Sequence, residues 1–509
     1  MQVKKDEYKL EYKLDIINKE FENCDDLVIR EFDVGVDKDC KMAIVYIDGM
    51  TDKALISEFA LNNLMVSSRV ATPNDIKNNI EDLIKKKTIA ITEIKEIKEM
   101  KECINNILVG ETLLFIDNVE ESILLSSRGW PTRSISEPQS EVVIRGARDG
   151  FTETLKVNTS LVRRRIRDTN LKIKNLSIGE KSKTDVALLY IEDIVNNDVL
   201  EEVKKRLDEI DIDVIQESGD IEQLIEDDCY SLFPQIQNTE RPDVVASSLY
   251  EGRVAILVDN TPFALMVPVT LTTFLQSPDD YYERWIIASF VRIIRWIAAG
   301  FSLFLPSLYI AISSYHPDML PTDLAVYLAA TRQGVPFPAF TEAFIMEATL
   351  ELLREAGVRL PRAIGSTIGI VGGLVIGQAA VQAGIVSPLM VIIVAITAIS
   401  SFAIPSYNMA IGFRIYRFGF MIMASILGLY GIILVFLVML IDLANLRSFG
   451  IPYLEPLCSV GENFKDLKDS IIRAPIPSMD TRPKMYTKKN RNRLDDKRKE
   501  IFGEDDIKK

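Results

Sequence analysis

Residues 363–413 read AIGSTIGIVGGLVIGQAAVQAGIVSPLMVIIVAITAISSFAIPSYNMAIGF and contain no Asp, Glu, Lys or Arg. A helix that crosses a bilayer needs about 20 apolar residues, so this stretch is long enough for two such helices and a connection. Pro388 indicates the connection and Pro405 the end of the second helix, because proline interrupts helical hydrogen bonding. The stretch therefore predicts a membrane protein.

Glycine recurs at every fourth position in the first part of this stretch. A helix places residues with that spacing on one face, and a face of small residues lets another helix approach closely within lipid. The same face suits the wall of a pore, so both interpretations stay open. The candidate pore or helix-packing residues are Gly365, Gly369, Gly373 and Gly377 of this face and, beside them in the sequence, Val371 and Gln378.

The chain divides by composition into soluble and apolar parts. Its net charge of −14 argues against a nucleic-acid partner, because nucleic acids bind basic surfaces. We predict an α/β cytoplasmic N-terminal region of two subdomains and a polytopic α-helical membrane domain. The expected boundaries are 1–110 and 111–283 for the two soluble α/β subdomains, 284–446 for a membrane domain with four to six spans or re-entrant segments, and 447–509 for a polar, basic C-terminal tail.

Residues suited to catalysis or metal binding are scarce. The five cysteines are scattered without a CxxC pair, which is typical of free thiols in a reducing compartment, and His316 is the single histidine. The loop over residues 192–195, after a predicted strand, lacks the glycines of a phosphate-binding turn. The sequence therefore predicts no enzyme, no cofactor and no metal site.

Positive charges predict which side of the membrane each flank occupies. The N-terminus lacks the apolar segment of a signal peptide, and arginines precede the first expected span, Trp296–Ile312. The large N-terminal region is therefore expected in the cytoplasm; the arginines concerned are Arg284, Arg292 and Arg295. Arg414 and Arg417 are interpreted as marking the same side before a last long span over Phe418–Ile441.

The number of spans stays open. Counting Met319–Phe340 as a full crossing places the C-terminus outside, yet the tail after Arg473 is rich in Lys and Arg and is expected inside.

Apolar runs in the soluble part predict two hairpins, over residues 112–126 and 252–267. A βαβ-like unit is expected between them, with strands at 186–191 and 212–215 and a helix at 197–210.

A block of arginines between residues 126 and 175 has two interpretations. Arginine suits bidentate contacts with carboxylate or phosphate, which predicts an anion-binding or subunit-docking surface. The alternative is a solvated helix face with ion pairs inside the chain. The candidate subunit contacts are Arg128, Trp130, Arg145, Arg148, Arg164 and Arg165.

Glu347, Glu351 and Glu355 are spaced by four residues and share one helix face. In one interpretation they belong to an amphipathic helix at the cytoplasmic interface, with the acids in water. In the other they belong to a broken membrane segment and line a cation path or gate it, since carboxylates at membrane depth are usually functional.

Several blocks, taken in order, resemble the A subunit of the GerA family of spore germination receptors. The resemblance covers roughly residues 105–480. The blocks are RGWP (128–131), SEVVIRGARDGF (140–151), RRIR (164–167), GRVAILVD (252–259), SPDDYY (277–282), GVPFP (334–338), REAGVRLP (354–361), GQAAV (377–381) and SFGIPYL (448–454).

The resemblance implies a multi-pass protein of the spore inner membrane whose copies form a ring, possibly a pentamer, around a germinant-gated cation channel. It implies as partners a B-type transporter-like subunit, a C-type lipoprotein and the lipid bilayer. Alternatives are a sporulation-stage paralogue that releases ions or dipicolinate, a secondary transporter and a passive membrane scaffold.

Overall fold

The computed structural model describes residues 8–34, 40–56, 94–129, 137–138, 141, 143–359, 377–458, 466–487 and 489–493. The chain separates into two compact units, which are described one at a time. The N-terminal unit comprises Met1–Glu226, Ile236–Pro268 and Thr481–Asp496, and the helical unit comprises Asp227–Gln235, Val269–Asp480 and Lys497–Lys509.

The first sheet of the N-terminal unit is antiparallel, with strand order β1-β2-β4-β5-β3. Alternate residues of β2 and β4 point into two apolar clusters, one of them formed with α2 and α5. The elements are α2 (Leu10–Glu20), β1 (Leu27–Val34), β2 (Cys40–Ile47), β3 (Ile94–Ile97), α5 (Met100–Leu108), β4 (Thr112–Ile116) and β5 (Ser122–Leu125).

The boundary expected at residue 110 falls inside this sheet. All five residues of β4 are buried, so the strand needs neighbours on both sides, and it pairs with β2 and β5. The first subdomain therefore extends to Leu125 at least. The hairpin expected over 112–126 is confirmed as β4 and β5.

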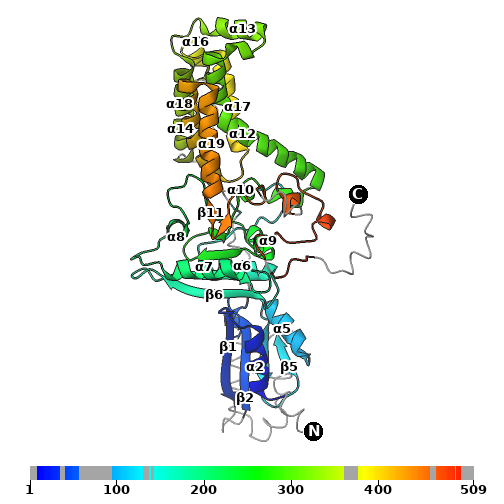
Figure 1. The fold of residues 1–509 in the computed structure, drawn as a ribbon. Helices are drawn as coiled ribbons and strands as arrows, with labels where there is room; N and C mark the ends of the chain where they lie inside the picture. The colour runs from blue at the N-terminus through cyan, green and yellow to red at the C-terminus, as the bar shows by residue number, and fades with distance from the viewer. Residues whose placement is uncertain are drawn as a thin grey trace. The chain divides into compact units, whose positions relative to one another are not determined.

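The second sheet is also antiparallel, with order β6-β7-β9-β10-β8. Helices α6 and α9 share an apolar cluster with its central strands (Figure 1). The elements are α6 (Leu155–Arg165), β6 (Leu171–Ile178), β7 (Thr184–Ile191), α7 (Asn197–Asp208), α8 (Ser218–Ile225), β8 (Gln237–Thr239), α9 (Pro242–Glu251), β9 (Val254–Val258) and β10 (Ala264–Val267).

The hairpin over 252–267 is confirmed as β9 and β10, whereas the predicted βαβ unit is wrong. Residues 212–215 form no strand; they run beside the β6–β7 turn, where the Thr184 hydroxyl donates to the carbonyl of Ile215 at 2.8 Å. The apolar pair Ile212 and Ile215 thus packs as loop, and the neighbour of β7 is the later strand β9.

A buried ion pair joins the two sheets of the N-terminal unit. Arg163 on α6 is fully buried and binds Asp26 through two hydrogen bonds of 2.8 and 2.9 Å. A third bond of 2.9 Å runs from Arg163 to the carbonyl of Leu171, the first residue of β6. One guanidinium therefore fixes α6, β6 and the segment before β1 together.

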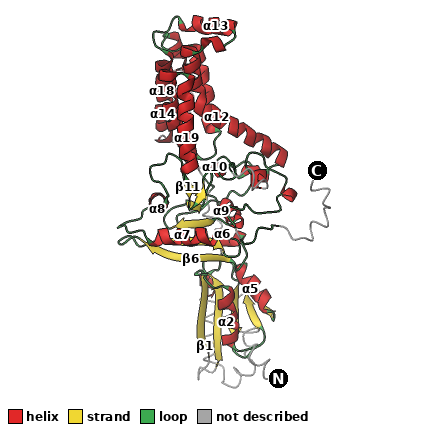
Figure 2. Cartoon of the chain, viewed as in Figure 1, coloured by secondary structure: helices red, strands yellow, loops and turns green. Residues whose placement is uncertain are grey.

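The helical unit contains two described helices, α12 and α18, that are long and apolar enough to cross a bilayer by length and composition. Helices α17 and α19 are apolar but shorter. Figure 2 shows helices and connecting loops in this part, together with one small strand pair, β11 (Arg447–Ser448) and β12 (Ile451–Pro452). The described α-helices are α10 (Leu271–Phe274), α11 (Asp279–Tyr282), α12 (Trp285–Tyr315), α13 (Thr322–Arg332), α14 (Ala339–Arg359), α16 (Gly377–Gln382), α17 (Pro388–Phe402), α18 (Tyr407–Leu427) and α19 (Leu429–Asn445).

The single last span predicted over Phe418–Ile441 is wrong, because the chain turns at Gly428. This residue has φ of +61°, a left-handed conformation that glycine adopts without steric cost. The hydroxyl of Tyr416, in the middle of α18, donates to Asp442 near the end of α19 at 2.7 Å. The two helices are therefore antiparallel.

The chain enters and leaves the helical unit at the same end. The amide of Leu271, ahead of α12, donates to the carbonyl of Tyr453, which follows α19, at 2.9 Å. Arg292, in the second turn of α12, pairs with Asp469 at 2.7 Å. The first part of the expected tail is thus folded against the helical unit, and Thr481–Asp496 belongs to the N-terminal unit.

We expect Arg163→Ala to lower the free energy of unfolding of the N-terminal unit by about 3–5 kcal/mol, because it leaves the Asp26 carboxylate buried without its partner. Native-state hydrogen exchange of β2 and β6 in the full chain measures this loss. Arg167→Ala is the control, since Arg167 is exposed. Equal protection in the two variants would contradict the role given to Arg163.

Candidate functional site

Five charged side chains meet inside the apolar helical unit. On α14, positions 347, 351 and 354 fall on one face because their spacing follows the helical repeat. On α18, positions 414 and 417 are one turn apart and face α14. We call these residues the ionic cluster: Glu347, Glu351, Arg354, Arg414 and Arg417.

Arg417 bridges the two carboxylates of the cluster. Its Nη2 lies 3.0 Å from Glu347 Oε2 and 3.2 Å from Glu351 Oε1, and Arg414 Nη1 binds the other oxygen of Glu351 at 2.7 Å. Glu347 and Arg417 are 0% exposed. Two carboxylates thus face three guanidinium groups, which leaves one net positive charge when all five are ionised.

Neighbouring helices complete the cluster. Arg354 donates to the hydroxyl of Ser401 on α17 at 2.9 Å, and its guanidinium lies 4.7 Å from the ring centre of Phe402. Arg417 also donates to the carbonyl of Ser302 on α12 at 3.5 Å. Four helices, α12, α14, α17 and α18, therefore converge on the cluster.

The cluster is not fully hydrogen-bonded. Within the described part of the chain, neither oxygen of Glu347 accepts a hydrogen bond of good geometry, and the Nε atoms of Arg354 and Arg417 donate none. The contact of Glu347 with Arg417 is therefore mainly electrostatic. Buried charges with unused hydrogen-bonding capacity are costly, and charged groups among membrane helices are typical of functional sites.

Sequence reasoning found part of this cluster. The three acids expected to act alike do not: Glu347 and Glu351 are in the cluster, whereas Glu355 pairs with Arg359 at 2.7 Å and both are exposed. The interpretation with all three acids in water does not describe Glu347. The cation path stays a prediction, and here arginines are the cations beside Glu347 and Glu351.

The role of Arg414 and Arg417 was missed. They were interpreted as flanking a span, but they lie inside α18, and Arg417 is fully buried. A signal was present in the sequence: apolar residues on both sides of the pair continue one helix, so the arginines need buried acids elsewhere. Glu347 and Glu351 are the acids that meet this need.

A second buried acid was also missed. Glu342, at the start of α14, is 0% exposed and accepts a hydrogen bond of 3.0 Å from the amide of Ser387, the residue before α17. Arg332 lies 3.4 Å from the same carboxylate, and the hydroxyl of Tyr309 meets that of Ser387 at 3.3 Å. A carboxylate at a helix N-terminus is stabilised by the helix dipole.

Most of the predicted glycine face lies outside the described residues, namely Gly365, Gly369, Val371 and Gly373. Gly377 and Gln378 begin α16. Gly377 is buried, and a Cβ there would lie 3.5 Å from Val391 on α17, whereas Gln378 is exposed. Gly377 is thus a close contact between helices, and Gln378 is not.

The candidate subunit contacts belong to the N-terminal unit and do not form one cluster. Arg128 pairs with Glu111 at 2.7 Å and Arg148 with Glu137 at 3.4 Å, while Arg145 is exposed. Trp130 lies outside the described residues. The remaining two arginines share the carboxylate of Asp149, at 3.3 and 2.6 Å respectively; these are Arg164 and Arg165.

The two arginines lower the pKa of the Asp149 carboxyl. Burial alone would raise the pKa of its carboxyl, but the hydrogen bond and charge of Arg165, with the charge of Arg164, outweigh burial and hold the pKa below its usual value. Ion pairs within the chain thus account for Arg164 and Arg165.

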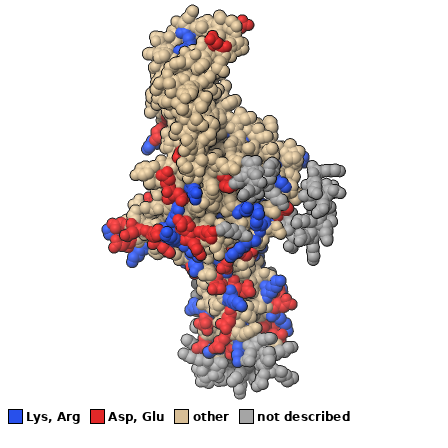
Figure 3. Space-filling model, in the orientation of Figure 1, with Lys and Arg blue, Asp and Glu red and all other residues tan. Residues whose placement is uncertain are grey.

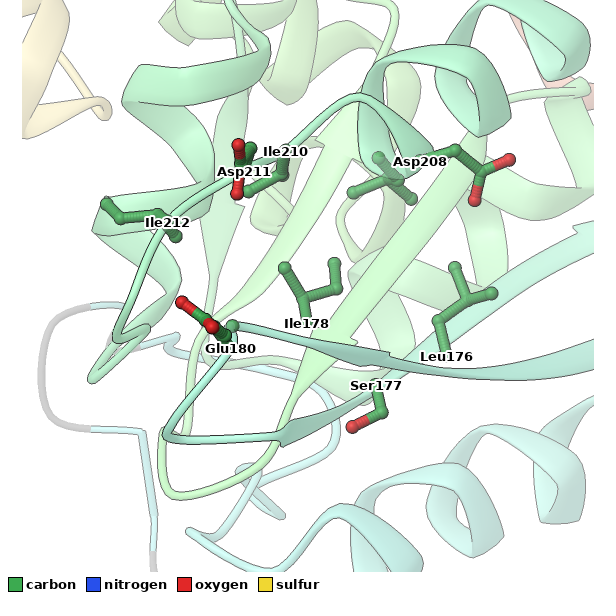
Figure 4. Close-up of a pocket in the computed structure, with 10 residues that line it drawn as sticks. Leu176, Ser177, Ile178, Glu180, Asp208, Ile210, Asp211 and Ile212 are labelled. Atoms are coloured by element: carbon green, nitrogen blue, oxygen red, sulfur yellow. The ribbon is translucent and has the colours of Figure 1, made fainter.

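The N-terminal unit also has a shallow pocket of about 340 Å³ beside the β6–β7 turn (Figure 4). Leu176 and Ile178 form its apolar floor, and Glu180, Asp208 and Asp211 lie around its margin. None of the residues predicted as a site lines it. Among the described residues, no group of three His, Cys, Asp or Glu side chains is placed to hold a metal ion.

Comparison with known proteins gives a family match over most of the chain. Residues 15–485 match the family described as Bacillus/Clostridium GerA spore germination protein. The chain is 45% identical to spore germination protein KA of Bacillus subtilis over 475 residues, which cover 93% of this chain and 86% of that protein.

Two further similarities are found. Stage V sporulation protein AF of Bacillus subtilis is 31% identical over 91% of this chain and 93% of its own length. A solved structure, the N-terminal domain of the A subunit of the Bacillus megaterium spore germinant receptor GerK3, is 36% identical and matches 51% of this chain and 95% of its own, with a TM-score of 0.40.

We expect Arg417→Leu to destabilise the helical unit by about 3–5 kcal/mol, because the buried Glu347 loses its counter-charge. The double variant Glu347→Leu/Arg417→Leu should recover most of this loss, since an apolar pair needs no desolvation. Denaturant titration of the full chain in detergent micelles measures both.

The matched control is Arg359→Leu, which removes an arginine from an exposed pair on α14 and should leave stability unchanged. Should Arg417→Leu behave like Arg359→Leu, the ionic cluster would not hold the helices together.

Proposed function

Because the chain belongs to the GerA family of spore germination proteins, we propose that it is the A subunit of a nutrient germinant receptor in the spore inner membrane. We propose further that its copies form a ring around a cation channel that opens when a germinant binds to the receptor. The ionic cluster is the observation that supports a gated unit. The cluster connects α14 to α18 by ion pairs. Charged side chains inside an apolar helix bundle are costly and are usually functional.

The arrangement of the helices supports a multi-pass membrane domain. Helices α12 and α18 have the length and composition of spans, and Figure 3 shows few charged atoms on the visible face of this unit. Since the segments before α12 and after α19 contact each other, both flanks belong to one side of the membrane. Positive charges in the tail make the cytoplasm that side in our proposal.

We place the pore beside the glycine face. The contact of Gly377 with Val391 on α17 brings one end of that face against a helix next to the ionic cluster. Residues 365–373 then supply the wall, where small side chains leave room for an ion. Glu347 and Glu351 act through their arginine partners as the gate's fixed charges.

The proposed partners are further copies of the chain, a B-type transporter-like subunit that carries nutrient binding, a C-type lipoprotein and lipid. The alternative is a sporulation-stage channel for ions or dipicolinate, which the 31% identity to stage V sporulation protein AF keeps open. The higher identity to protein KA, 45%, favours the receptor subunit.

Variants of the glycine face test the pore. In vesicles that contain the full chain and its partner subunits, Val371→Ala should raise the resting cation leak, because it widens the wall, and Gly373→Leu should lower the germinant-induced flux. A potassium-sensitive dye inside the vesicles reports both. Gly419→Ala is the control, since a Cβ there meets nothing within 4 Å. Unchanged flux in both variants would remove the pore from this face.

Charge reversal tests the proposed subunit contacts. Arg145→Glu/Arg148→Glu should shift the full chain in detergent from a ring towards the monomer, because both arginines are exposed and Arg148 makes a surface ion pair with Glu137 that a neighbouring copy can replace. Mass photometry measures the distribution. Lys205→Glu, an exposed change on α7, is the control. If the ring persists after the charge reversal, Arg145 and Arg148 do not form subunit contacts.

A further inference from the structure

Helix α12 is longer than a bilayer needs. Its 31 residues span about 46 Å at 1.5 Å per residue, whereas the hydrocarbon core is about 30 Å thick. To fit entirely inside, the helix would have to tilt by about 50°, beyond the roughly 0–40° found for such helices. About ten of its residues therefore lie outside the hydrocarbon core.

The excess residues are at the start of the helix. The second half of α12 is packed into the apolar core of the unit, where Leu303, Tyr309 and Ile310 are buried. In the first half, large apolar side chains are exposed, and Figure 1 shows this half leaving the bundle. The exposed side chains include Trp285, Ile286, Ile287, Phe290, Ile293 and Ile294.

The opposite face of this segment is closed by protein. Arg292 and Arg295, the two charged residues of α12, both bind the carboxylate of Asp280, at 2.9 and 2.8 Å, and Arg292 also binds Asp469 at 2.7 Å. The hydroxyl of Ser289 donates to a backbone carbonyl at 2.9 Å. Because both arginines are buried on this closed face, the exposed face of the segment carries no charged side chain.

Arg292 and Arg295 lower the pKa of the Asp280 carboxyl. Burial would raise the pKa of its carboxyl, but the hydrogen bond and charge of Arg295 and the charge of Arg292 hold it below its usual value. Asp280 is therefore ionised at neutral pH, and the closed face stays intact.

We propose that residues 285–295 form an interfacial helix that lies on the bilayer surface, with its apolar face in the boundary between headgroups and acyl chains. This inference rests on the proposed membrane placement of the chain. The occupant is lipid because the exposed face continues directly into Ile297 and Phe301, further along the same helix, where the bilayer core begins. A tryptophan at the outer end, Trp285, suits the headgroup level.

The depth of Trp285 tests the proposal. The chain has three tryptophans, so Trp130→Phe/Trp296→Phe leaves Trp285 as the single fluorophore of the full chain. In vesicles of phosphatidylethanolamine and phosphatidylglycerol, we expect stronger quenching by lipid brominated near the headgroup than by lipid brominated near the chain end, and weak quenching by aqueous acrylamide.

Two matched probes accompany it. Phe290→Trp in a tryptophan-free background (with Trp285→Phe) repeats the test should the first variant fold poorly, and it should give the same order of quenching. Phe301→Trp should give the reverse order, with the chain-end bromines more effective, because it lies within the core.

The quenching results show whether the apolar face of residues 285–295 contacts lipid, water or another protein chain. Strong acrylamide quenching of Trp285 without lipid quenching would place the segment in water, and protection from both quenchers would place it against another protein chain; either result overturns the proposal. Vesicle flotation tests the membrane placement separately from the interfacial helix. Protein that does not float with vesicles would contradict the membrane placement itself.

Discussion

The helical unit depends on the pairing of two carboxylates with three guanidinium groups between α14 and α18. Removing the fully buried Glu347 and Arg417 from water costs several kcal/mol, and the attraction within the cluster offsets that cost only while the partners stay in place. Arg417 touches Glu347, Glu351 and the carbonyl of Ser302, so it connects three helices at once. Apolar contacts alone allow neighbouring helices to shift along one another, whereas these ion pairs fix one register between α14 and α18.

The same device occurs in the N-terminal unit, where Arg163 binds Asp26 between two sheets. In both units a buried arginine joins segments that are distant in the sequence. Such a pair is strongly destabilised when one partner is lost, which makes it a fixed point. Among the described residues, no donor makes a hydrogen bond of good geometry to Glu347, so its contact with Arg417 has fewer hydrogen bonds than the Asp26 pair, as the proposed gating would need.

Local patterns in the sequence predicted local structure well. The hairpins β4–β5 and β9–β10 follow from apolar runs and the turns between them, and α17 follows from Pro388 at the start of an uncharged run. Failures arose where the partner lies far along the chain. Residues 212–215 have the composition of a strand, but β9 occupies the place beside β7. Gly428 looks like any glycine in an apolar helix until its backbone conformation is known.

For the site, the sequence identified Glu347 and Glu351 but not their partners. Arg414 and Arg417 resemble arginines at a membrane boundary, and only the fold of α18 against α14 shows that they are buried. Charge alone therefore predicted a candidate position, while the pairing required three-dimensional contacts. Glu342 was missed for the same reason, since its partner Ser387 is 45 residues away.

The most direct measurement is a cryo-microscopy map of the full chain in lipid nanodiscs. We expect α14 beside α18 within the lipid slab, with Glu347 at ion-pair distance from Arg417 and several copies around one axis. A map with α14 on the membrane surface, and with Glu347 and Glu351 in water, would contradict it.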